Sequence, residues 1–398
     1  MIERHLAKVL QKAAGQYPVV TVTGPRQSGK TTLVRATFPD HDYVSLEAPD
    51  YRAFALEDPR GFLKQYPGPV ILDEAQKTPD LFSYVQVLVD EEPQAGRFII
   101  TGSQNFLLLA KISQSLAGRC AIHYLAPLAL TEIIQRTPMA IATIGAVIPR
   151  HPPPSESLWT VMHRGFFPRI HDQQLDPQDW LRNYYQTYLE RDVREITNIG
   201  DMESFGRFVR LCAGRCGQLL NLVSLANDAS VSHSTAKRWL SILEASFVVF
   251  LLRPHFKNFN KRLVKMPKLY FMDTGLLSYL LRIRDADDLT RHSMRGAIFE
   301  NFVIVELLKN YLNRGQDADI YFWRDSRGHE IDLLIESGQQ LIPVEIKSGE
   351  TVIDDFFKGL DYWRQLSGGL DSPAALVYGG EASYQRRGVA VYSWSQWG

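Results

Sequence analysis

The feature that most constrains the fold is the stretch YPVVTVTGPRQSGKTTLVR at residues 17–35. It begins with a short apolar, β-branched run, which is the composition of a buried parallel strand. A Gly-Pro pair ends that run, and helix-forming residues resume five positions later. The phosphate-loop pattern G-x-x-x-x-G-K-[ST] is matched by Gly24, Gly29, Lys30 and Thr31. The stretch therefore predicts a strand, a phosphate-binding loop and a helix within an α/β unit.

The chemistry of phosphate binding explains these residue types. Glycines let the backbone curl so that successive N–H groups point inward at phosphate oxygens, and the following helix adds the positive end of its dipole. Lys30 reaches the β- and γ-phosphates, and the Thr31 hydroxyl is placed to bind Mg²⁺. We expect ATP and Mg²⁺ at this loop, with the nucleotide bound by residues Gly24, Pro25, Arg26, Gln27, Ser28, Gly29, Lys30, Thr31 and Thr32.

Length and composition limit the class of protein. At 398 residues the chain is too long for one ordinary core, so two or three domains are expected. Its 45% hydrophobic and 22% charged residues are typical of a folded globular protein and exclude a disordered one. The formal net charge is zero, so any contact with nucleic acid must come from a local patch.

The cysteines and the hydropathy of the chain indicate the cellular compartment in which we expect the protein. Cys120, Cys212 and Cys216 form no C-x-x-C pair, which indicates reduced thiols. We interpret Cys212 and Cys216 as packing residues rather than metal ligands, because no second ligand pair lies nearby. No signal peptide and no apolar run long enough to span a bilayer are recognisable. We therefore expect a cytoplasmic protein with no membrane partner.

A second apolar run, residues 69–72, ends in Asp73 and Glu74. Acids at the carboxyl end of a buried parallel strand stand where open α/β sheets bind their ligands. Asp73 is expected to hold Mg²⁺, and Glu74 to orient and deprotonate the attacking water. The position of this pair, some forty residues after the phosphate loop, strengthens the assignment.

Two further residues are candidates for the nucleotide site. Ser103 follows the predicted strand at residues 97–101, where it could contact the γ-phosphate together with Gln104 or Asn105. The alternative is an ordinary polar loop, since Ser, Asn and Gly are common turn formers. Arg119 is a candidate for stabilising charge on the transferred phosphoryl group, in its own subunit or a neighbour's within a homo-oligomer. A solvated arginine is the alternative.

Together these motifs resemble the AAA+ ATPase module of a large bacterial and archaeal family. The resemblance rests on GPRQSGKTT at residues 24–32, LDEAQ at residues 72–76 and ITGS at residues 100–103. It also keeps Arg119, in the stretch SLAGR, as an arginine-finger candidate. The roles that it implies are Walker A for Lys30 and Thr31, Walker B for Asp73 and Glu74, and sensor 1 for Ser103.

The middle of the chain resembles a winged helix. A proline-rich linker at residues 148–154 precedes it, and the segment at residues 188–193 resembles one that follows this ATPase in the family. A helix is expected at residues 219–227 and a second from residue 232, followed by an apolar run. In such a module the second helix lies in the major groove with the following side chains toward the nucleic acid: His233, Lys237 and Arg238.

A run of six basic residues without an acid, Arg253 to Lys268, is the best candidate for a DNA or RNA contact. Phe256 and Phe259 are interleaved with the basic residues and suit base stacking. The alternative is a wing that docks a protein. The basic residues are Arg253, Lys257, Lys261, Arg262, Lys265 and Lys268.

Near the carboxyl end, two predicted strands at residues 329–335 and 341–348 carry acids with period two. Asp332 follows Glu330 on one strand, and Lys347 follows Glu345 on the next, so each pair shares a face. Glu300 is available from the helix expected at residues 296–311. Carboxylates that hold Mg²⁺ and a lysine that steadies the nucleophile are what metal-assisted phosphodiester hydrolysis requires.

This pattern resembles the PD-(D/E)xK restriction-endonuclease-like fold, which follows the ATPase in the same family. The resemblance implies a metal held by Asp332 and Glu345, with Glu300 and Lys347 as further catalytic residues. One departure is that Ile331 stands where the motif has proline. The alternative is an ion cluster that is retained for structure and does not cleave.

The sequence thus predicts an α/β chain of three domains. These are an AAA+-like P-loop ATPase at residues 1–140, a helical, winged-helix-like domain at 155–290 and a restriction-endonuclease-like α/β domain at 291–398. The expected function is a Mg²⁺-dependent ATPase coupled to a nuclease-like domain that acts on or binds nucleic acid. The alternative is an ATP-switched interaction protein whose nuclease-like domain is not catalytic.

Overall fold

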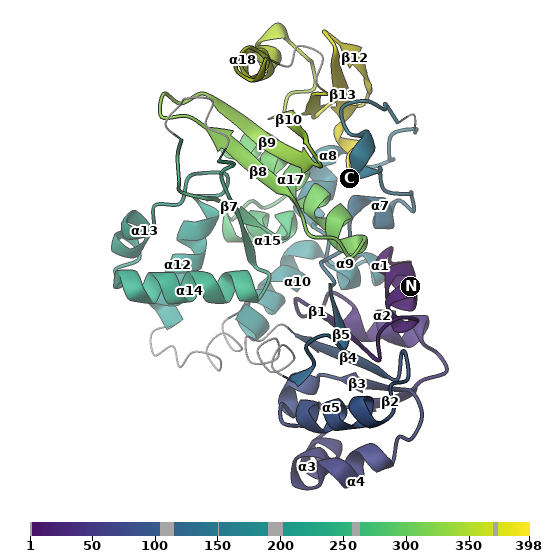
Figure 1. The fold of residues 1–398 in the computed structure, drawn as a ribbon. Coiled ribbons are helices and arrows are strands. Elements are labelled where there is room, and N and C mark those ends of the chain that lie inside the picture. The colour runs from purple at the N-terminus through teal and green to yellow at the C-terminus, as the bar shows by residue number, and fades with distance from the viewer. Residues whose placement is uncertain (1, 104–114, 150, 190–201, 257–262, 369–372) are drawn as a thin grey trace. The chain divides into compact units, whose positions relative to one another are not determined.

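The computed structural model describes residues 2–103, 115–149, 151–189, 202–256, 263–368 and 373–398 (Figure 1). These residues form two compact units. Unit 1 comprises residues 1–128, 245–247 and 311–317, and unit 2 comprises 129–244, 248–310 and 318–398. Within the described ranges, no helix combines the length and the apolar character needed to cross a bilayer.

Unit 1 contains a parallel sheet of five strands in the order β2-β3-β4-β1-β5. The strands are β1 (Val19–Gly24), β2 (Asp42–Ser45), β3 (Val70–Asp73), β4 (Phe98–Ser103) and β5 (Cys120–Tyr124). Every residue of β1, β3 and β4 is buried, as expected for central strands covered on both faces. The N-terminal parallel α/β sheet that the sequence predicts is therefore confirmed.

Helices cover both faces of this sheet. One face carries α1 (Leu6–Ala14) and α2 (Lys30–Thr37), and the other carries α3 (Pro49–Glu57), α4 (Pro59–Lys64) and α5 (Leu81–Glu91). Alternation along β1 explains this division, since Val20 and Val22 pack with α1 and α2 whereas Val19 packs with the other helices. Because the strands are parallel, the carboxyl ends of β1, β3 and β4 meet at one edge, where open α/β sheets bind their ligands.

The first part of unit 2 is mainly helical. Its helices are α7 (Leu130–Ile133), α8 (Leu158–Arg164), α9 (Pro168–Asp172), α10 (Pro177–Tyr184), α12 (Met202–Ala213), α13 (Leu222–Asp228), α14 (His233–Ala245), α15 (Thr274–Leu280) and α16 (Ala286–Arg291). Of the segment expected at residues 188–193, residues 190–193 lie outside the described residues. Helix α13 begins later than predicted because Asn221 caps it, accepting the Ser224 N–H at 3.0 Å.

Helices α12 to α14 are followed by an antiparallel hairpin of β6 (Val249–Leu252) and β7 (Lys268–Phe271). Trp239 of α14 is buried and makes edge contacts with two phenylalanines of α12, Phe205 and Phe208. These aromatic contacts fix the two helices against each other.

The second part of unit 2 is a mixed sheet of six strands in the order β12-β13-β11-β10-β9-β8. The strands are β8 (Ile320–Arg324), β9 (Glu330–Ser337), β10 (Gln340–Lys347), β11 (Ala375–Tyr378), β12 (Tyr384–Arg386) and β13 (Val389–Ser393). Strands β8, β9 and β10 are antiparallel neighbours, whereas β10, β11 and β13 run parallel. The strands predicted at residues 329–335 and 341–348 are both present.

Two helices complete this region, α17 (Arg295–Asn313) and α18 (Lys358–Ser367). Leu360 and Trp363 of α18 pack on Trp323 and Ile331 of the sheet. Because Ile331 faces α18, its neighbours Glu330 and Asp332 point to the opposite face. Most residues of the two predicted domains at 155–290 and 291–398 fall within unit 2, except residues 245–247 and 311–317, which belong to unit 1. The division into three domains remains a prediction.

Candidate functional site

The loop between β1 and α2 depends on two glycines. Gly29 has φ 91°, in the left-handed region where glycine is favoured. A Cβ on Gly24 would lie 2.2 Å from the carbonyl oxygen of Leu125, so only glycine fits there. Within the loop Ser28 is fully buried, and its Oγ donates to the Pro25 carbonyl at 2.9 Å. Arg26 is half-buried, and Gln27 and Thr32 are exposed.

Lys30 is folded into the loop. Its Nζ donates to the carbonyl oxygens of Gly24 at 3.1 Å and Pro25 at 2.9 Å, and only 6% of the residue is exposed. Burial lowers the pKa of Lys30 to about 8, although the nearby carboxylates of Glu74 and Asp73 act in the opposite direction. An anionic phosphate in the loop would favour the charged ammonium.

Thr31 and Asp73 form a pair of oxygen ligands beside the loop. The Thr31 hydroxyl donates to Asp73 Oδ1 at 3.0 Å, across the 42 residues that separate them in sequence. Hydroxyl and carboxylate oxygens are what Mg²⁺ prefers, so these residues fit the ion that the sequence predicts. Asp73 is 4% exposed and also accepts from the hydroxyls of Thr101 and Tyr43, the latter at 2.8 Å.

Tyr43 and Thr101 were not predicted to belong to the site. Both stand on strands that pair with β3, and only the sheet register reveals that they reach Asp73. Burial raises the pKa of Tyr43 to about 12, and its hydrogen bond to Asp73 adds to this effect. Both hydroxyls therefore donate to Asp73 and orient its carboxylate.

Glu74 and Ser103 lie together at the same edge. Ser103 stands opposite Gly24 in the parallel register, and its Oγ donates to Glu74 Oε2 at 3.2 Å. Gln76, which stands in the LDEAQ motif but was not predicted to have a role, donates to both Glu74 and Ser103, the latter at 3.1 Å. Gln104 and Asn105 lie outside the described residues.

Arg119 lies at the other end of the sheet. Its carbonyl accepts the N–H of Val19, the first residue of β1, whereas the phosphate loop follows the last residue of that strand. Its guanidinium pairs with Asp90, including Nη2 to Oδ2 at 3.0 Å. At about 3.3 Å per residue, the six residues of β1 separate Arg119 from its own phosphate loop. A role within its own subunit does not fit this position, and a role in a neighbour remains a prediction.

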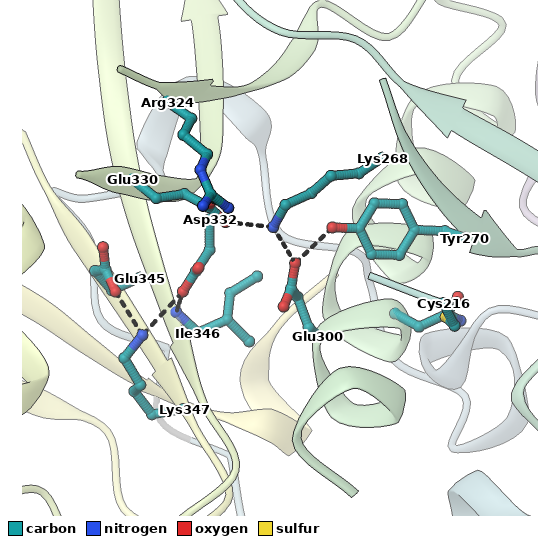
Figure 2. Close-up of polar contacts among 11 residues, drawn as sticks. Cys216, Lys268, Tyr270, Glu300, Arg324, Glu330, Asp332, Glu345, Ile346 and Lys347 are labelled. Carbon is teal, nitrogen blue, oxygen red and sulfur yellow. Dashed lines mark hydrogen bonds and ion pairs between the residues drawn. The ribbon is translucent and has the colours of Figure 1, made fainter. Parts of the chain in front are cut away.

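The second group of predicted site residues gathers in unit 2 (Figure 2). Lys347 Nζ lies 2.6 Å from Glu345 Oε2 and 3.0 Å from Asp332 Oδ2, and the Ile346 N–H also donates to Asp332. Burial and the charge of Asp332 raise the pKa of Glu345, although Lys347 opposes them. Burial also tends to raise the pKa of Asp332, but the charges of Lys347 and Lys268 hold this pKa below its usual value.

Lys268 brings β7 to the same cluster. Its ammonium lies 2.9 Å from Glu300 Oε1 and 2.5 Å from Glu330 Oε1, and Figure 2 shows it between these two carboxylates. Tyr270 donates to Glu300, and Arg324 Nη1 donates to Glu330 at 2.9 Å. Glu300 therefore reaches the region of Asp332, but it is ion-paired with Lys268, which was predicted to belong to the basic run.

Lys268 was expected in the exposed basic run, and this expectation is wrong. The residue is 3% exposed because its ammonium is paired with two carboxylates inside unit 2. Among the other residues of the run, Arg253 and Lys265 are exposed. Lys257, Phe259, Lys261 and Arg262 lie outside the described residues. On α14, His233, Lys237 and Arg238 are exposed, as the predicted interface requires.

Replacing Lys268 by methionine should destabilise unit 2 strongly. It removes the ammonium that compensates Glu300 and Glu330, and breaking one side of a buried pair costs about 3–5 kcal/mol of unfolding free energy. Urea unfolding followed by circular dichroism measures the loss. As a control, Lys358→Met removes an exposed lysine paired only at the surface with Asp355, and the midpoint should not move. Equal midpoints for both variants would contradict this reading of Lys268.

The parallel sheet and the loop geometry of unit 1 resemble those of P-loop ATPases. A family model described as an AAA domain matches residues 16–134. Two further family models match later parts of the chain. One is a domain of unknown function (DUF8612) at residues 155–287, and the other is a domain of unknown function (DUF4143) at residues 295–397.

Two mycobacterial proteins are similar over most of the chain. Both are described as uncharacterized, one from Mycobacterium tuberculosis and one from Mycobacterium bovis. Each is 33% identical over 355 residues, which cover 88% of this chain and 75% of the relative. The chain belongs to the same family as these two proteins.

Solved structures resemble the chain more distantly. The Walker-type ATPase of Pyrococcus abyssi covers 71% of this chain and 96% of its own, with a TM-score of 0.42 and 14% identity. The Thermotoga maritima RuvB Holliday junction branch migration motor covers 62% of this chain and 87% of its own, with a TM-score of 0.27 and 18% identity. DnaA of Aquifex aeolicus covers 60% of this chain and 85% of its own, with a TM-score of 0.28 and 14% identity. These values are too low to support an inference about activity.

Proposed function

We propose that the chain binds ATP with Mg²⁺ at the loop of residues 24–32 and hydrolyses it. The observation that carries this proposal is the convergence of two pairs at one sheet edge, Thr31 with Asp73 and Ser103 with Glu74. The AAA domain match over residues 16–134 supports the same activity.

Each residue has a distinct part in the proposed reaction. The loop N–H groups and Lys30 hold the β- and γ-phosphates, and Lys30 exchanges its two carbonyl contacts for phosphate oxygens. Thr31 and Asp73 would hold Mg²⁺, which when bound neutralises charge on these phosphates. Glu74 orients the attacking water and accepts its proton, while Ser103 contacts the γ-phosphate.

We further propose that the cluster of unit 2 acts on nucleic acid as a metal-dependent nuclease. The order α17-β8-β9-β10-α18-β11 supports the likeness to the PD-(D/E)xK fold. Asp332 and Glu345 lie on either side of one lysine, so two carboxylates share a single ammonium and leave an excess of negative charge, while burial and the charge of Asp332 raise the pKa of Glu345. A divalent cation held by these two carboxylates would relieve that excess.

A winged-helix-like segment would bring the nucleic acid to this cluster. The three helices α12 to α14 and the hairpin β6–β7 support this proposal. Exposed basic side chains on α14, with Arg253, Lys265 and a 74% exposed Phe256 after it, suit phosphate contacts and base stacking. We expect ATP hydrolysis to rise when DNA or RNA is added, and this stimulation to weaken with salt.

The nuclease proposal is tested by cleavage of supercoiled plasmid and single strands with Mg²⁺ or Mn²⁺, with and without ATP. We expect metal-dependent cutting that Lys347→Ala lowers by about 10²-fold, the scale for one electrostatic donor at a reacting centre. Lys358→Ala, in an exposed surface pair, should cut as the wild type does. No cutting by folded, ATP-hydrolysing protein would contradict the proposal.

One observation favours a second candidate function. Lys268 compensates Glu300 and Glu330, and among the described residues no group of three or more His, Cys, Asp or Glu side chains is arranged to hold a metal ion. The cluster would then be structural, and the chain an ATP-switched interaction protein. ATP hydrolysis that is indifferent to nucleic acid, together with no cleavage, would support this second function.

A further inference from the structure

Arg4 is a buried arginine that contacts the phosphate loop from outside. It precedes α1 in unit 1 and is 8% exposed. Its Nη1 donates to the carbonyl oxygen of Ser28 at 2.7 Å, and its Nη2 donates to the carbonyl oxygen of Ala126 at 2.8 Å. A guanidinium with two forked donors can hold both carbonyls at once.

The two carbonyls belong to segments that already pack on each other. The Leu125 N–H continues β5 by donating to Thr23 of β1 at 2.8 Å. The Leu125 carbonyl lies so close to Gly24 that no Cβ would fit. Arg4 therefore links Ser28, in the second half of the loop, to the segment of Leu125 and Ala126, which also contacts Gly24, the first residue of the loop. Both halves of the loop are thus in contact with the same segment.

Helix α1 keeps Arg4 in place. Leu6 and Leu10 are fully buried and pack with Val22 of β1 and Val34 of α2. Since α1 is anchored on the same core as the strand and helix that flank the loop, the guanidinium cannot follow a displaced loop without disturbing that core. The packing of α1 therefore fixes the position of the Arg4 guanidinium, and this guanidinium holds the Ser28 carbonyl in place.

The contact also affects the donors of the loop. The Ser28 carbonyl belongs to the same peptide group as the N–H of Gly29, which lies within the phosphate-loop pattern. A cation that binds the carbonyl polarises this peptide and makes its N–H a stronger donor. The buried positive charge also raises the potential felt by an anion in the loop.

We infer that Arg4 is a positioning residue for ATP. It orients the Ser28–Gly29 peptide so that the loop binds phosphate, without touching the nucleotide itself. This inference rests on the proposed ATPase function. Because the oriented loop contacts the phosphates before and during the reaction, Arg4 should affect ATP affinity more than the rate of the bound complex.

The test compares Arg4→Met and Arg4→Lys with the wild type. Titration with a fluorescent ATP analogue and Mg²⁺ gives Kd, and steady-state hydrolysis gives kcat and KM. We expect Arg4→Met to raise Kd and KM about 10- to 100-fold, the scale of hydrogen bonds to charged groups, with kcat within about threefold. Arg4→Lys should be intermediate, because one ammonium keeps the charge but cannot replace the fork.

Arg97→Met is the matched control. Arg97 is 6% exposed in the same unit, but it precedes β4 at the sheet edge remote from the loop and pairs with Glu92 at 3.2 Å. The Arg97→Met substitution should lower the melting temperature and leave the Kd for the ATP analogue within twofold of the wild-type value.

Three results would overturn the inference. The first is a wild-type Kd in Arg4→Met with only a lower melting temperature. The second is an equal rise of Kd in Arg97→Met, because lost stability would then explain both. Should Arg4→Met not fold, an unchanged Kd in Arg4→Lys would be the third. A wild type that binds no ATP would instead refute the proposed function, and the inference with it.

Discussion

Lys30→Ala should weaken ATP binding by about 10²-fold or more. The substitution removes the only ammonium among the residues predicted to bind the nucleotide, and charge-assisted hydrogen bonds to phosphate are the strong ones. The structure adds that the ammonium is already buried among loop carbonyls, so little ordering is needed when phosphate replaces them. Titration with a fluorescent ATP analogue in the presence of Mg²⁺ measures the change.

The control for this experiment is Lys77→Ala in the same unit. Lys77 is one-third exposed and makes a loose ion pair with Glu47 at 3.7 Å, so its loss should leave the affinity unchanged. Wild-type affinity in Lys30→Ala, measured on protein with an unchanged melting temperature, would refute the assignment of the phosphate loop.

Glu74→Gln should stop turnover while leaving ATP bound. The amide keeps the size of the side chain and its contacts with Ser103 and Gln76, but it cannot accept a proton from water. General-base catalysis contributes about 10²–10⁴-fold, so kcat should fall by that factor. Because Glu74 has no assigned contact with the ground-state phosphates, Kd should stay within about threefold.

Phosphate release measured at saturating ATP, combined with the binding titration, separates the two effects. The control is Glu47→Gln, an exposed acid in the same unit, which should hydrolyse ATP at the wild-type rate. Turnover of Glu74→Gln at the wild-type rate would show that another residue activates the water. Lost binding together with lost turnover would instead point to a damaged fold.

The sequence alone predicted how the nucleotide-site candidates come together. A phosphate loop is a local structure, because its glycines, lysine and hydroxyl stand within eight residues and depend on their own backbone. Asp73, Glu74 and Ser103 were predictable for a topological reason, since the carboxyl ends of parallel strands share one edge of the sheet. Tyr43 and Thr101 were missed because their contacts depend on strand order and register, which no local pattern contains. Gln76 stood within the LDEAQ motif, but its contact with Ser103, 27 residues away, appears only in the tertiary structure.

The cluster of unit 2 shows where such reasoning fails. The spacing on β9 and β10 correctly placed Asp332 beside Glu345 and Lys347, because alternation along a strand is a local property. Lys268 was misread, since in sequence it is one more cation of a basic run. Its partners Glu300 and Glu330 are 32 and 62 residues away, and only the tertiary structure buries it between them.

Two arginines also show the difference between what a motif predicts and what the tertiary structure decides. Arg119 was a candidate by its motif, but the strand register placed it at the edge opposite its own phosphate loop. Arg4 carries no recognisable motif, yet the packing of α1 sets its guanidinium against the loop. The sequence by itself therefore determined the loop, the strand-end acids and the class of the N-terminal unit, because these follow from local backbone geometry and periodicity. Which charges are buried, and against which partners, was decided only by the tertiary structure, because burial depends on segments that are distant along the chain.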